Sequence, residues 1–258
     1  MSLNRPLRNW PGARVWVVGA SSGIGAAVAQ ALLAQGARVA LSARSAPELE
    51  RMAALHGDAA IALPLDVTDA AAAAAALQRI VGAWGGIDFV FLCAGTHQPA
   101  RAWEFDAGTA RRLVDVNLNG VLNCLPPVVQ QMLQQQSGAI GIVSSVAGYG
   151  GLPTALVYGA TKAALINLAE TLYLDLSPRG IGVFLINPGF VKTPLTDRNR
   201  FHMPALIGVD EAAREILAGL SRGRFEIHFP RRFTRWLKLL QLLPYRLYFA
   251  LVRRGTGL

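Results

Sequence analysis

Short runs of hydrophobic residues alternate along the chain with longer segments whose apolar positions recur at helical spacing. These runs are almost continuously apolar, which is typical of strands in a parallel sheet that is covered on both faces. Helical segments between successive runs indicate repeated strand–helix–strand units. We therefore predict an α/β fold with a doubly wound parallel sheet of about seven strands, at residues 14–20, 37–43, 60–65, 88–94, 139–145, 182–187 and 225–229.

A glycine-rich segment directly follows the first predicted strand. Gly19, Gly23 and Gly25 lie there in a Gly-x3-Gly-x-Gly spacing, and a helical pattern begins among them. Glycines at such a turn let the backbone approach a ligand closely, and the free N–H groups at the helix start can bind a pyrophosphate. Because strand, turn, helix and second strand follow in this order, the segment predicts a Rossmann-like nucleotide-binding unit.

The end of the second predicted strand bears on which dinucleotide is bound. NAD-binding sites usually place an acidic residue here, which accepts hydrogen bonds from the ribose 2′-hydroxyl. This chain instead has Ser42 and Ala43, followed by Arg44 and Ser45. A guanidinium can bind a 2′-phosphate through two hydrogen bonds, whereas a carboxylate would repel it. We therefore predict NADP(H) rather than NAD(H), with Arg44 as the main determinant and Ser45 as support.

Candidate catalytic residues follow the fifth predicted strand. Tyr158 and Lys162 are four residues apart, so on a helix both side chains project from one face, and Ser145 lies thirteen residues before Tyr158. A free tyrosine has a pKa of about 10, and we expect the Lys162 ammonium and the positive nicotinamide to lower it. The Ser145 hydroxyl would orient a substrate carbonyl or alcohol. The pattern predicts hydride transfer, with Tyr158 supplying or removing the proton.

Several motifs occur together over roughly residues 13 to 230: GASSGIG, LDV, CAG, VNLNG, Ser145 with YGATK, and NPGFVKT. In these motifs the chain resembles the short-chain dehydrogenase/reductase superfamily, in its compact single-domain branch. The resemblance implies a catalytic set of Asn117, Ser145, Tyr158 and Lys162, in which Asn117 holds a water that links Lys162 to solvent. Where the family commonly has Asn-Asn-Ala-Gly, this chain has Leu92-Cys93-Ala94-Gly95 and so lacks the asparagines that brace the sheet.

The resemblance also implies a set of cofactor contacts. Asp66 matches the position that contacts the adenine, and the segment after the sixth strand matches the one that holds the nicotinamide. The expected cofactor-binding residues are Gly19, Ser21, Ser22, Gly23, Ile24, Gly25, Arg44, Ser45, Asp66, Val67, Ala94, Gly95, Tyr158, Lys162, Pro188, Gly189, Val191 and Thr193.

Substrate contacts are expected in the variable segments around this set: His97, Val146, Ala147, Leu152 and Phe190, with a lid at about residues 194–208. The apolar character of these segments favours a hydrophobic ketone or alcohol. Two alternatives remain open: reduction of a 3-oxoacyl group on an acidic carrier or coenzyme, and a non-catalytic NADPH-binding sensor or scaffold. Family members are commonly dimers or tetramers, so the resemblance also implies a homo-oligomer.

The charge is concentrated near the end of the chain. The formal net charge is +9, and residues 222–254 hold nine basic side chains against one acid, Glu226. Leucines are interleaved with these arginines, which argues against a nucleic-acid-binding face. We divide the chain into a nucleotide-binding domain at 1–230 and a basic, amphipathic helical extension at 231–258, broken into two helices by Pro244. Its apolar surface could pack near the substrate lid, on a partner subunit, or on a bilayer surface through residues 231–254.

Other classes of protein are disfavoured by composition. Hydrophobic residues make up 52% of the chain and no linker or repeat divides it, so one ordered domain is expected. Cys93 and Cys124 lie in apolar runs without metal-ligand spacing, and His56, His97, His202 and His228 show no such spacing either, so we expect no metal site. We expect a cytoplasmic protein, with possible peripheral membrane contact, because no cleavable signal or uninterrupted spanning segment stands out.

Overall fold

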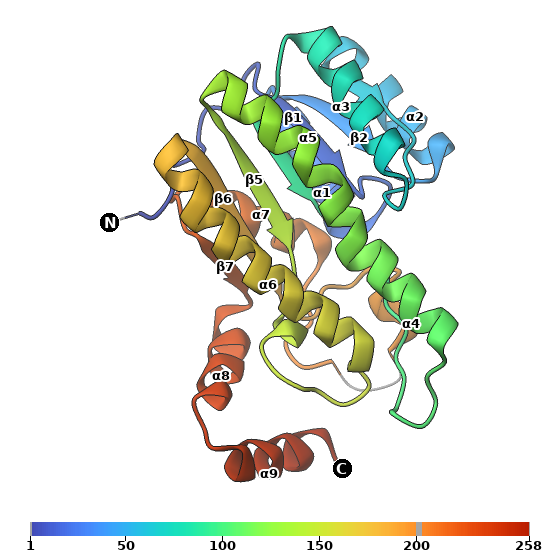
Figure 1. The fold of residues 1–258 in the computed structure, drawn as a ribbon, viewed down its shortest axis with the longest axis vertical. Helices are drawn as coiled ribbons and strands as arrows, with labels where there is room; N and C mark the ends of the chain where they lie inside the picture. The colour runs from blue at the N-terminus through green and yellow to red at the C-terminus, as the bar shows by residue number, and fades with distance from the viewer. Residues whose placement is uncertain (1, 200–202, 258) are drawn as a thin grey trace.

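A single parallel sheet forms the centre of the molecule (Figure 1). The structure is a computed structural model and describes residues 2–199 and 203–257. The strand order is β3-β2-β1-β4-β5-β6-β7, and every pairing is parallel. The strands are β1 (Arg14–Val18), β2 (Arg38–Ser42), β3 (Ala60–Ala62), β4 (Phe89–Leu92), β5 (Gly138–Val143), β6 (Ile181–Pro188) and β7 (Glu226–Phe229).

The predicted doubly wound α/β fold is confirmed, with all seven strands in place. The first five end one to three residues earlier than the apolar runs predict, because the chain turns out of the sheet into loops at that edge. After β1, for example, the N–H groups of Gly19 and Ala20 both donate to the Ser42 carbonyl, which bends the chain away from the ladder.

Helices cover both faces of the sheet. They are α1 (Gly23–Ala34), α2 (Ala46–Ala54), α3 (Ala70–Trp84), α4 (Ala107–Val114), α5 (Gly120–Gln135), α6 (Leu156–Leu176), α7 (Val209–Leu220), α8 (Arg231–Gln241) and α9 (Tyr245–Thr256). Shorter turns lie at 57–59, 115–119, 146–148, 177–179 and 196–198.

The core has two halves, one on each face of the sheet. In β1, Val15 and Val17 point into the half formed with α1, α2 and α7, while Trp16 and Val18 point into the half formed with α3, α5 and α6. Successive side chains of a strand point to opposite faces, so a strand that is apolar throughout must be covered twice. The continuous apolar runs in the sequence are explained by this double burial.

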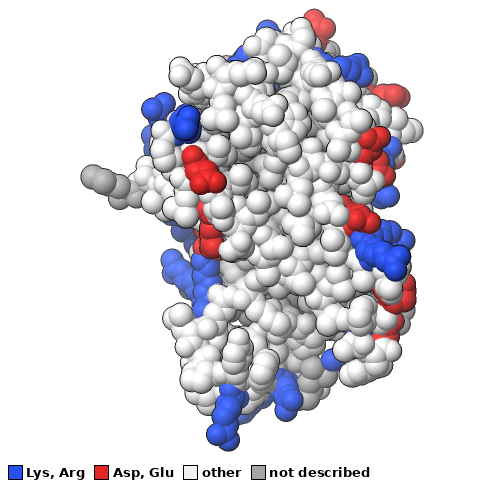
Figure 2. Space-filling view, viewed as in Figure 1, with Lys and Arg blue, Asp and Glu red and all other residues white. Residues whose placement is uncertain are grey.

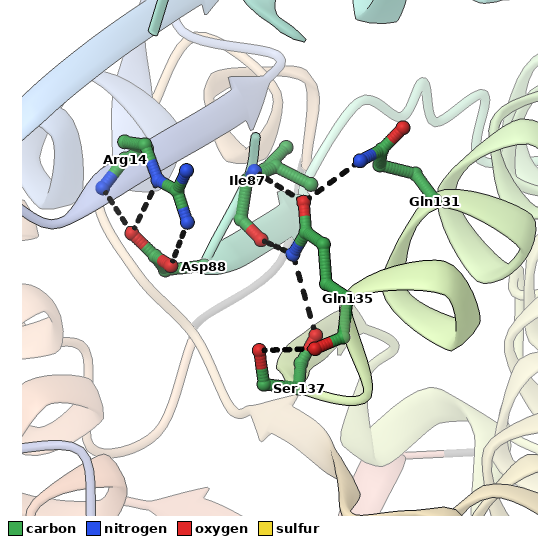
Figure 3. A network of polar contacts seen from close by, with 6 residues as sticks. All are labelled: Arg14, Ile87, Asp88, Gln131, Gln135 and Ser137. Atoms are coloured by element: carbon green, nitrogen blue, oxygen red, sulfur yellow. Dashed lines mark hydrogen bonds and ion pairs between the residues drawn. The ribbon is translucent and has the colours of Figure 1, made fainter. Parts of the chain in front are cut away.

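Polar side chains fix the amino-terminal edge of the sheet (Figure 3). The Arg14 guanidinium donates two hydrogen bonds to Asp88, at 2.9 and 2.6 Å, and the Arg14 N–H donates a third at 2.8 Å. Burial alone would raise the pKa of Asp88, but these bonds outweigh it and hold the pKa below its usual range. Beside them the Gln135 amide bonds both the N–H and the carbonyl of Ile87. These contacts tie the start of β1 to the residues just before β4 and to the end of α5.

The extension beyond β7 forms two helices separated at Pro244, as predicted, and lies outside the layered body (Figure 1). Thr234 and Lys238 of α8 face the domain, where Thr234 is fully buried. The larger apolar side chains Trp236, Leu239 and Leu242 face outward. Within the described residues, no helix is long and apolar enough to cross a membrane.

Candidate functional site

The glycine-rich turn after β1 lies at the carboxyl edge of the sheet and leads directly into α1. Gly19 has φ +97° and Gly23 has φ +58°, a region that favours glycine. A Cβ on Gly19 would lie 2.6 Å from the Ala94 nitrogen, and one on Gly25 would clash with the Gly19 carbonyl. The glycines are thus required by the fold itself, and they leave the backbone at the start of α1 bare. Ser21, Ser22 and Ile24 lie in the same turn and the first residues of the helix.

Arg44 and Asp66 come from the ends of neighbouring strands. Arg44 is exposed just beyond β2. Asp66 accepts hydrogen bonds from the Thr68 N–H and hydroxyl at 3.0 and 2.8 Å, which together with the nearby Arg44 charge lower its pKa. The Ser42 hydroxyl is buried and already accepts a bond from the Trp16 indole. Of the polar groups at the end of β2, Arg44 is therefore the one presented outward, beside Ser45 at the start of α2.

Asn117 lies fully buried in a π-helical turn between α4 and α5. Its Oδ1 accepts from the Thr96 N–H at 2.7 Å, and its Nδ2 donates to the Thr96 carbonyl at 2.9 Å. A Cβ on Gly95 would lie 3.4 Å from Asn117 Oδ1 and 3.7 Å from Lys162 Nζ. The loop after β4, with Ala94 and Gly95, is thus held against both Asn117 and Lys162.

The two serines after β5 differ in their partners. Ser144 is buried and donates to the Lys162 carbonyl at 2.7 Å. Ser145 accepts from the Ala147 N–H at 3.1 Å, and its hydroxyl acts to lower the pKa of Tyr158. Ser144 fastens the loop to α6, and Ser145 is the serine that faces the tyrosine.

Tyr158 and Lys162 lie on one face of α6, as their spacing predicts. Lys162 Nζ is 5.7 Å from the centre of the Tyr158 ring and donates to the Val143 carbonyl at 2.9 Å. Burial lowers the pKa of Lys162 to about 8. Burial raises the pKa of Tyr158 to about 12, although the Ser145 hydroxyl opposes this. In the protein alone the pKa of Tyr158 is therefore raised rather than lowered, because burial disfavours the charged phenolate.

The segment after β6 reaches back to the glycine-rich turn. Pro188 is the last residue of β6, and Gly189, Val191 and Thr193 follow it. The Thr193 methyl would lie 3.1 Å from a Cβ on Gly23. The end of the predicted lid at 194–208 is tied to the residues before it, since the Lys192 N–H donates to the Ile207 carbonyl and the Ile207 N–H donates to the Phe190 carbonyl. Residues 200–202 of this lid, including His202, lie outside the described residues.

Of the predicted substrate residues, His97 lies directly beside Tyr158. The His97 ring lies 4.4 Å from the Tyr158 ring, and Ala147 donates to Ser145. Phe190 contacts Phe233 of α8 at 5.8 Å between ring centres. Val146 and Leu152 line a small pocket in which Tyr149 and Gly150 meet Leu237, Leu240, Gln241 and Tyr248 of the extension.

One polar cluster beside this pocket was missed by the sequence analysis. Glu226 accepts from the Tyr149 hydroxyl at 2.6 Å and from Asn187 at 2.8 Å, and it pairs with Lys238. Glu226 was noted only as the single acid among nine basic residues. Its position as the one acid in a basic segment could have indicated an ion pair, because basic side chains surround it in the sequence.

Val67 and the two cysteines are packed inside the fold. Val67 packs against Gly120, where a Cβ would lie 2.6 Å from it. Cys93 and Cys124 are free thiols, and burial raises the pKa of Cys93 to about 11. Across residues 2–199 and 203–257 no three His, Cys, Asp or Glu side chains come together as a metal site would require.

Comparisons with known proteins agree with this arrangement. Residues 13–203 match the family model described as short chain dehydrogenase. An uncharacterised oxidoreductase of Myxococcus xanthus is 34% identical over 241 residues, which cover 92% of this chain and 95% of that protein.

Two solved structures show the same fold. A short-chain dehydrogenase/reductase of Burkholderia phymatum in complex with NAD has a TM-score of 0.83 at 25% identity, over 90% of this chain and 94% of its own. A short-chain dehydrogenase of Sphingobium yanoikuyae in complex with NADPH has a TM-score of 0.78 at 31% identity, over 88% and 92%. Similar proteins therefore bind either dinucleotide.

Proposed function

The chain belongs to the short-chain dehydrogenase/reductase family, and on this premise we propose that it is an NADP(H)-dependent oxidoreductase acting on a hydrophobic carbonyl or secondary alcohol. The observation that carries the proposal is the convergence of Asn117, Ser145, Tyr158 and Lys162 at one edge of the sheet. Four groups suited to one reaction meet there from three separate parts of the chain.

The residues fit a dinucleotide. The glycine cradle at 19–25 leaves bare backbone at the start of α1, where a pyrophosphate would accept hydrogen bonds. Asp66 and the loop at Ala94 and Gly95 would hold the adenosine, and residues 188–193 would hold the nicotinamide end. When bound, the nicotinamide supplies or accepts hydride.

NADP(H) is favoured by the charge at the end of β2. Arg44 is exposed there, and the neighbouring Ser42 hydroxyl is engaged by Trp16. A guanidinium in this place would bind a 2′-phosphate, and no acidic side chain follows β2 before Glu48 to receive a ribose hydroxyl.

Proton transfer falls to Tyr158. With a pKa of about 12 in the protein alone, Tyr158 is protonated at neutral pH and can act as the acid in carbonyl reduction. Ser145 would hold the substrate oxygen beside it. Lys162, whose pKa burial lowers to about 8, would contact the ribose and, when charged, favour the phenolate that Tyr158 becomes. Asn117 would hold the water that resupplies the proton.

A hydrophobic substrate is favoured by the lining of the site. Val146, Leu152 and Phe190 are apolar, and aromatic side chains of the loop and extension lie beside them. A 3-oxoacyl group on an acidic carrier is the second candidate, because the basic extension lies near this loop and could steer such a carrier.

Turnover by the Tyr158→Phe variant tests the proposal. We expect kcat for reduction of hydrophobic ketones by NADPH to fall roughly 10²- to 10⁴-fold, because the acid is lost, while NADPH affinity is kept. Nicotinamide absorbance measures turnover, and Tyr173→Phe on the same helix is the matched control, since its hydroxyl bonds the Leu3 carbonyl far from the site. NADPH binding without turnover across a broad panel would instead favour a sensor or scaffold.

Membership of the family supports an oligomeric assembly. We propose a homo-dimer or homo-tetramer, formed through the helices that follow Asn117 and carry Tyr158. Exposed leucines on α5 and α6, at 122, 133 and 156, support this assignment. Light scattering of the purified protein would reveal a monomer if the assignment is wrong.

A further inference from the structure

Helix α8 is attached to the domain both by polar side chains and by the apolar Phe233, Leu237 and Leu240. The Thr234 hydroxyl lies 2.6 Å from His228 Nδ1 and also donates to the Pro230 carbonyl, and Lys238 pairs with Glu226. A helix on a protein surface usually buries its apolar stripe and exposes a polar one, so large apolar side chains on the outward side need a separate explanation. The outward face of α8 nevertheless carries Trp236 and Leu239, whose exposure packing on its own domain does not explain.

This outward face continues onto the second helix of the extension. On α8 Trp236 is 69% exposed, and Leu242 directly after it is 81% exposed. On α9 Tyr245 is 78% exposed and stacks on Phe249, which is also exposed. Isolated surface leucines need no explanation, but contiguous large apolar side chains mark an interaction surface. We call this surface, formed by the exposed residues of α8 and α9 at 232–254, the tail face.

Basic side chains accompany the apolar ones. Arg232 and Arg235 line a groove together with Trp236 and Leu239. The extension at 231–258 holds seven basic residues and no acidic one. In the space-filling view, the coloured side chains at the lower end of the molecule, over α9, are basic (Figure 2). A partner that fits the tail face must therefore offer both apolar groups and negative charges.

We propose that the tail face docks the protein onto the surface of an anionic lipid bilayer. Tryptophan and tyrosine favour the membrane interface, and arginines beside them bind lipid phosphates. Neither helix is long enough to span, so both lie in the interfacial plane with their apolar side chains among the acyl chains. A second copy of the chain is a poorer occupant, since a symmetric contact would bring the two arginine sets against each other.

The inner side of the extension connects this surface to the loop at 146–152. The Tyr248 hydroxyl donates to the Gly151 carbonyl at 2.8 Å, and a Cβ on Gly150 would lie 2.7 Å from that hydroxyl. Glu226 links Lys238 of α8 to Tyr149 of the loop. Through these contacts a docked membrane would lie near the substrate loop. If the proposed function holds, a lipid-soluble carbonyl compound would then not need to cross water to reach Ser145.

Vesicle flotation of the full chain tests membrane docking. Because flotation does not depend on turnover, a negative result would contradict the docking proposal and leave the proposed function untouched. Vesicles of phosphatidylcholine alone are compared with vesicles that also contain phosphatidylglycerol. We expect flotation with the anionic vesicles, weakened by salt. Arg232→Gln/Arg235→Gln should weaken binding roughly 30-fold, at about fivefold for each charge near an anionic surface. Trp236→Ser/Leu242→Ser should abolish it.

Matched controls separate the tail face from general charge and hydrophobicity. Arg51→Gln/Arg79→Gln removes two exposed charges from α2 and α3, and Leu3→Ser/Leu55→Ser removes two leucines that are 62% and 77% exposed. Both controls should float as the unchanged protein does. All variants should keep the same thermal midpoint, because the altered side chains are exposed.

Two results would overturn the proposal. One is absence of flotation with anionic vesicles, or equal binding by the tail and control variants. The other is a dimer in light scattering that Trp236→Ser/Leu242→Ser dissociates while no variant binds vesicles, which would assign the tail face to a second copy.

Discussion

Ser144 and Ser145 are chemically identical neighbours, and their surroundings separate them. The Ser144 hydroxyl is used by the Lys162 carbonyl inside the fold, while Ser145 is left to meet Tyr158. Ser42 and Arg44 differ in the same way, because the Ser42 hydroxyl already accepts a hydrogen bond from Trp16 while the Arg44 side chain is exposed. Whether a side chain can contact a substrate or cofactor thus depends on which hydrogen-bond partners it already has within the fold.

Substitution of Arg44 should change the choice of dinucleotide. We expect Arg44→Asp to lower the ratio of kcat/KM for NADPH over NADH roughly 100-fold, because a charged hydrogen-bonding partner of the 2′-phosphate becomes a repelling carboxylate. Steady-state rates with both cofactors measure the ratio. Arg38→Asp changes an equally exposed arginine at the opposite end of β2 and should leave the ratio unaltered. An unaltered ratio in Arg44→Asp would remove the basis for NADP(H).

The placement of the candidate residues on strands, turns and helices was predictable from the sequence, but the protonation of Tyr158 and Lys162 was not. Tyr158 and Lys162 fall on one face of a helix by spacing alone, and the glycines are fixed by the turn they must form. The pKa of each depends on how much protein surrounds it, which spacing does not reveal. The role of Glu226 was equally hidden, because its partners Tyr149 and Lys238 are 77 and 12 residues away.

Elements with a uniform environment were the easiest to predict. The strands of the sheet are buried on both faces, so their apolar runs predicted each one, and only the ends differed where loops begin. Helix α8 shows the limit of this approach. Its hydrophobic pattern indicates a helix and its break at Pro244, but the pattern says nothing of which face meets the domain. That depends on distant partners, which are the polar His228 and Glu226 and the apolar Phe190.

The amino-terminal edge of the sheet offers a test at the scale of elements. Asp88→Asn should lower the free energy of unfolding by about 1 kcal/mol at neutral pH, since the Arg14 pair is partly exposed. The Asp88 pKa is lower in the folded protein, so its contribution is present above the unfolded pKa of about 4 and is lost as the pH falls through the folded value.

Urea unfolding at neutral and acid pH measures this difference. The difference in the free energy of unfolding between the unchanged protein and Asp88→Asn should disappear as the pH falls below about 4. A gap that stays constant with pH would show that the Asp88 charge does not contribute. Glu104→Gln, at a loop glutamate that caps only the Arg101 N–H, serves as the comparison.

At the scale of the whole molecule, charge and chemistry are arranged at one end. The carboxyl edge of the sheet carries the candidate site, and the extension that holds seven of the basic residues lies beyond the same edge. Without residues 231–258 the formal net charge would fall from +9 to +2. The rest of the surface is close to neutral, so long-range attraction acts through the extension.

Salt dependence distinguishes the two candidate substrate classes. With a free, uncharged hydrophobic ketone, kcat/KM should be nearly constant between low and physiological ionic strength, because there is no charge to steer. With a 3-oxoacyl group on an acidic carrier it should fall at least tenfold over the same range, since steered association weakens steeply with salt. The rates are measured with both substrates in one salt series. A high, salt-sensitive rate with the carrier would make the carried substrate the better assignment.

Tyr248 is the one buried residue of α9. A helix of twelve residues is only marginally stable by itself in water, because few hydrogen bonds offset the cost of starting it. With a single side chain anchored on Gly151, the backbone of α9 can open and close without disturbing the sheet. Its helical state is thus set less by its own sequence than by whatever lies against it, and α9 is the segment whose order should follow its surroundings.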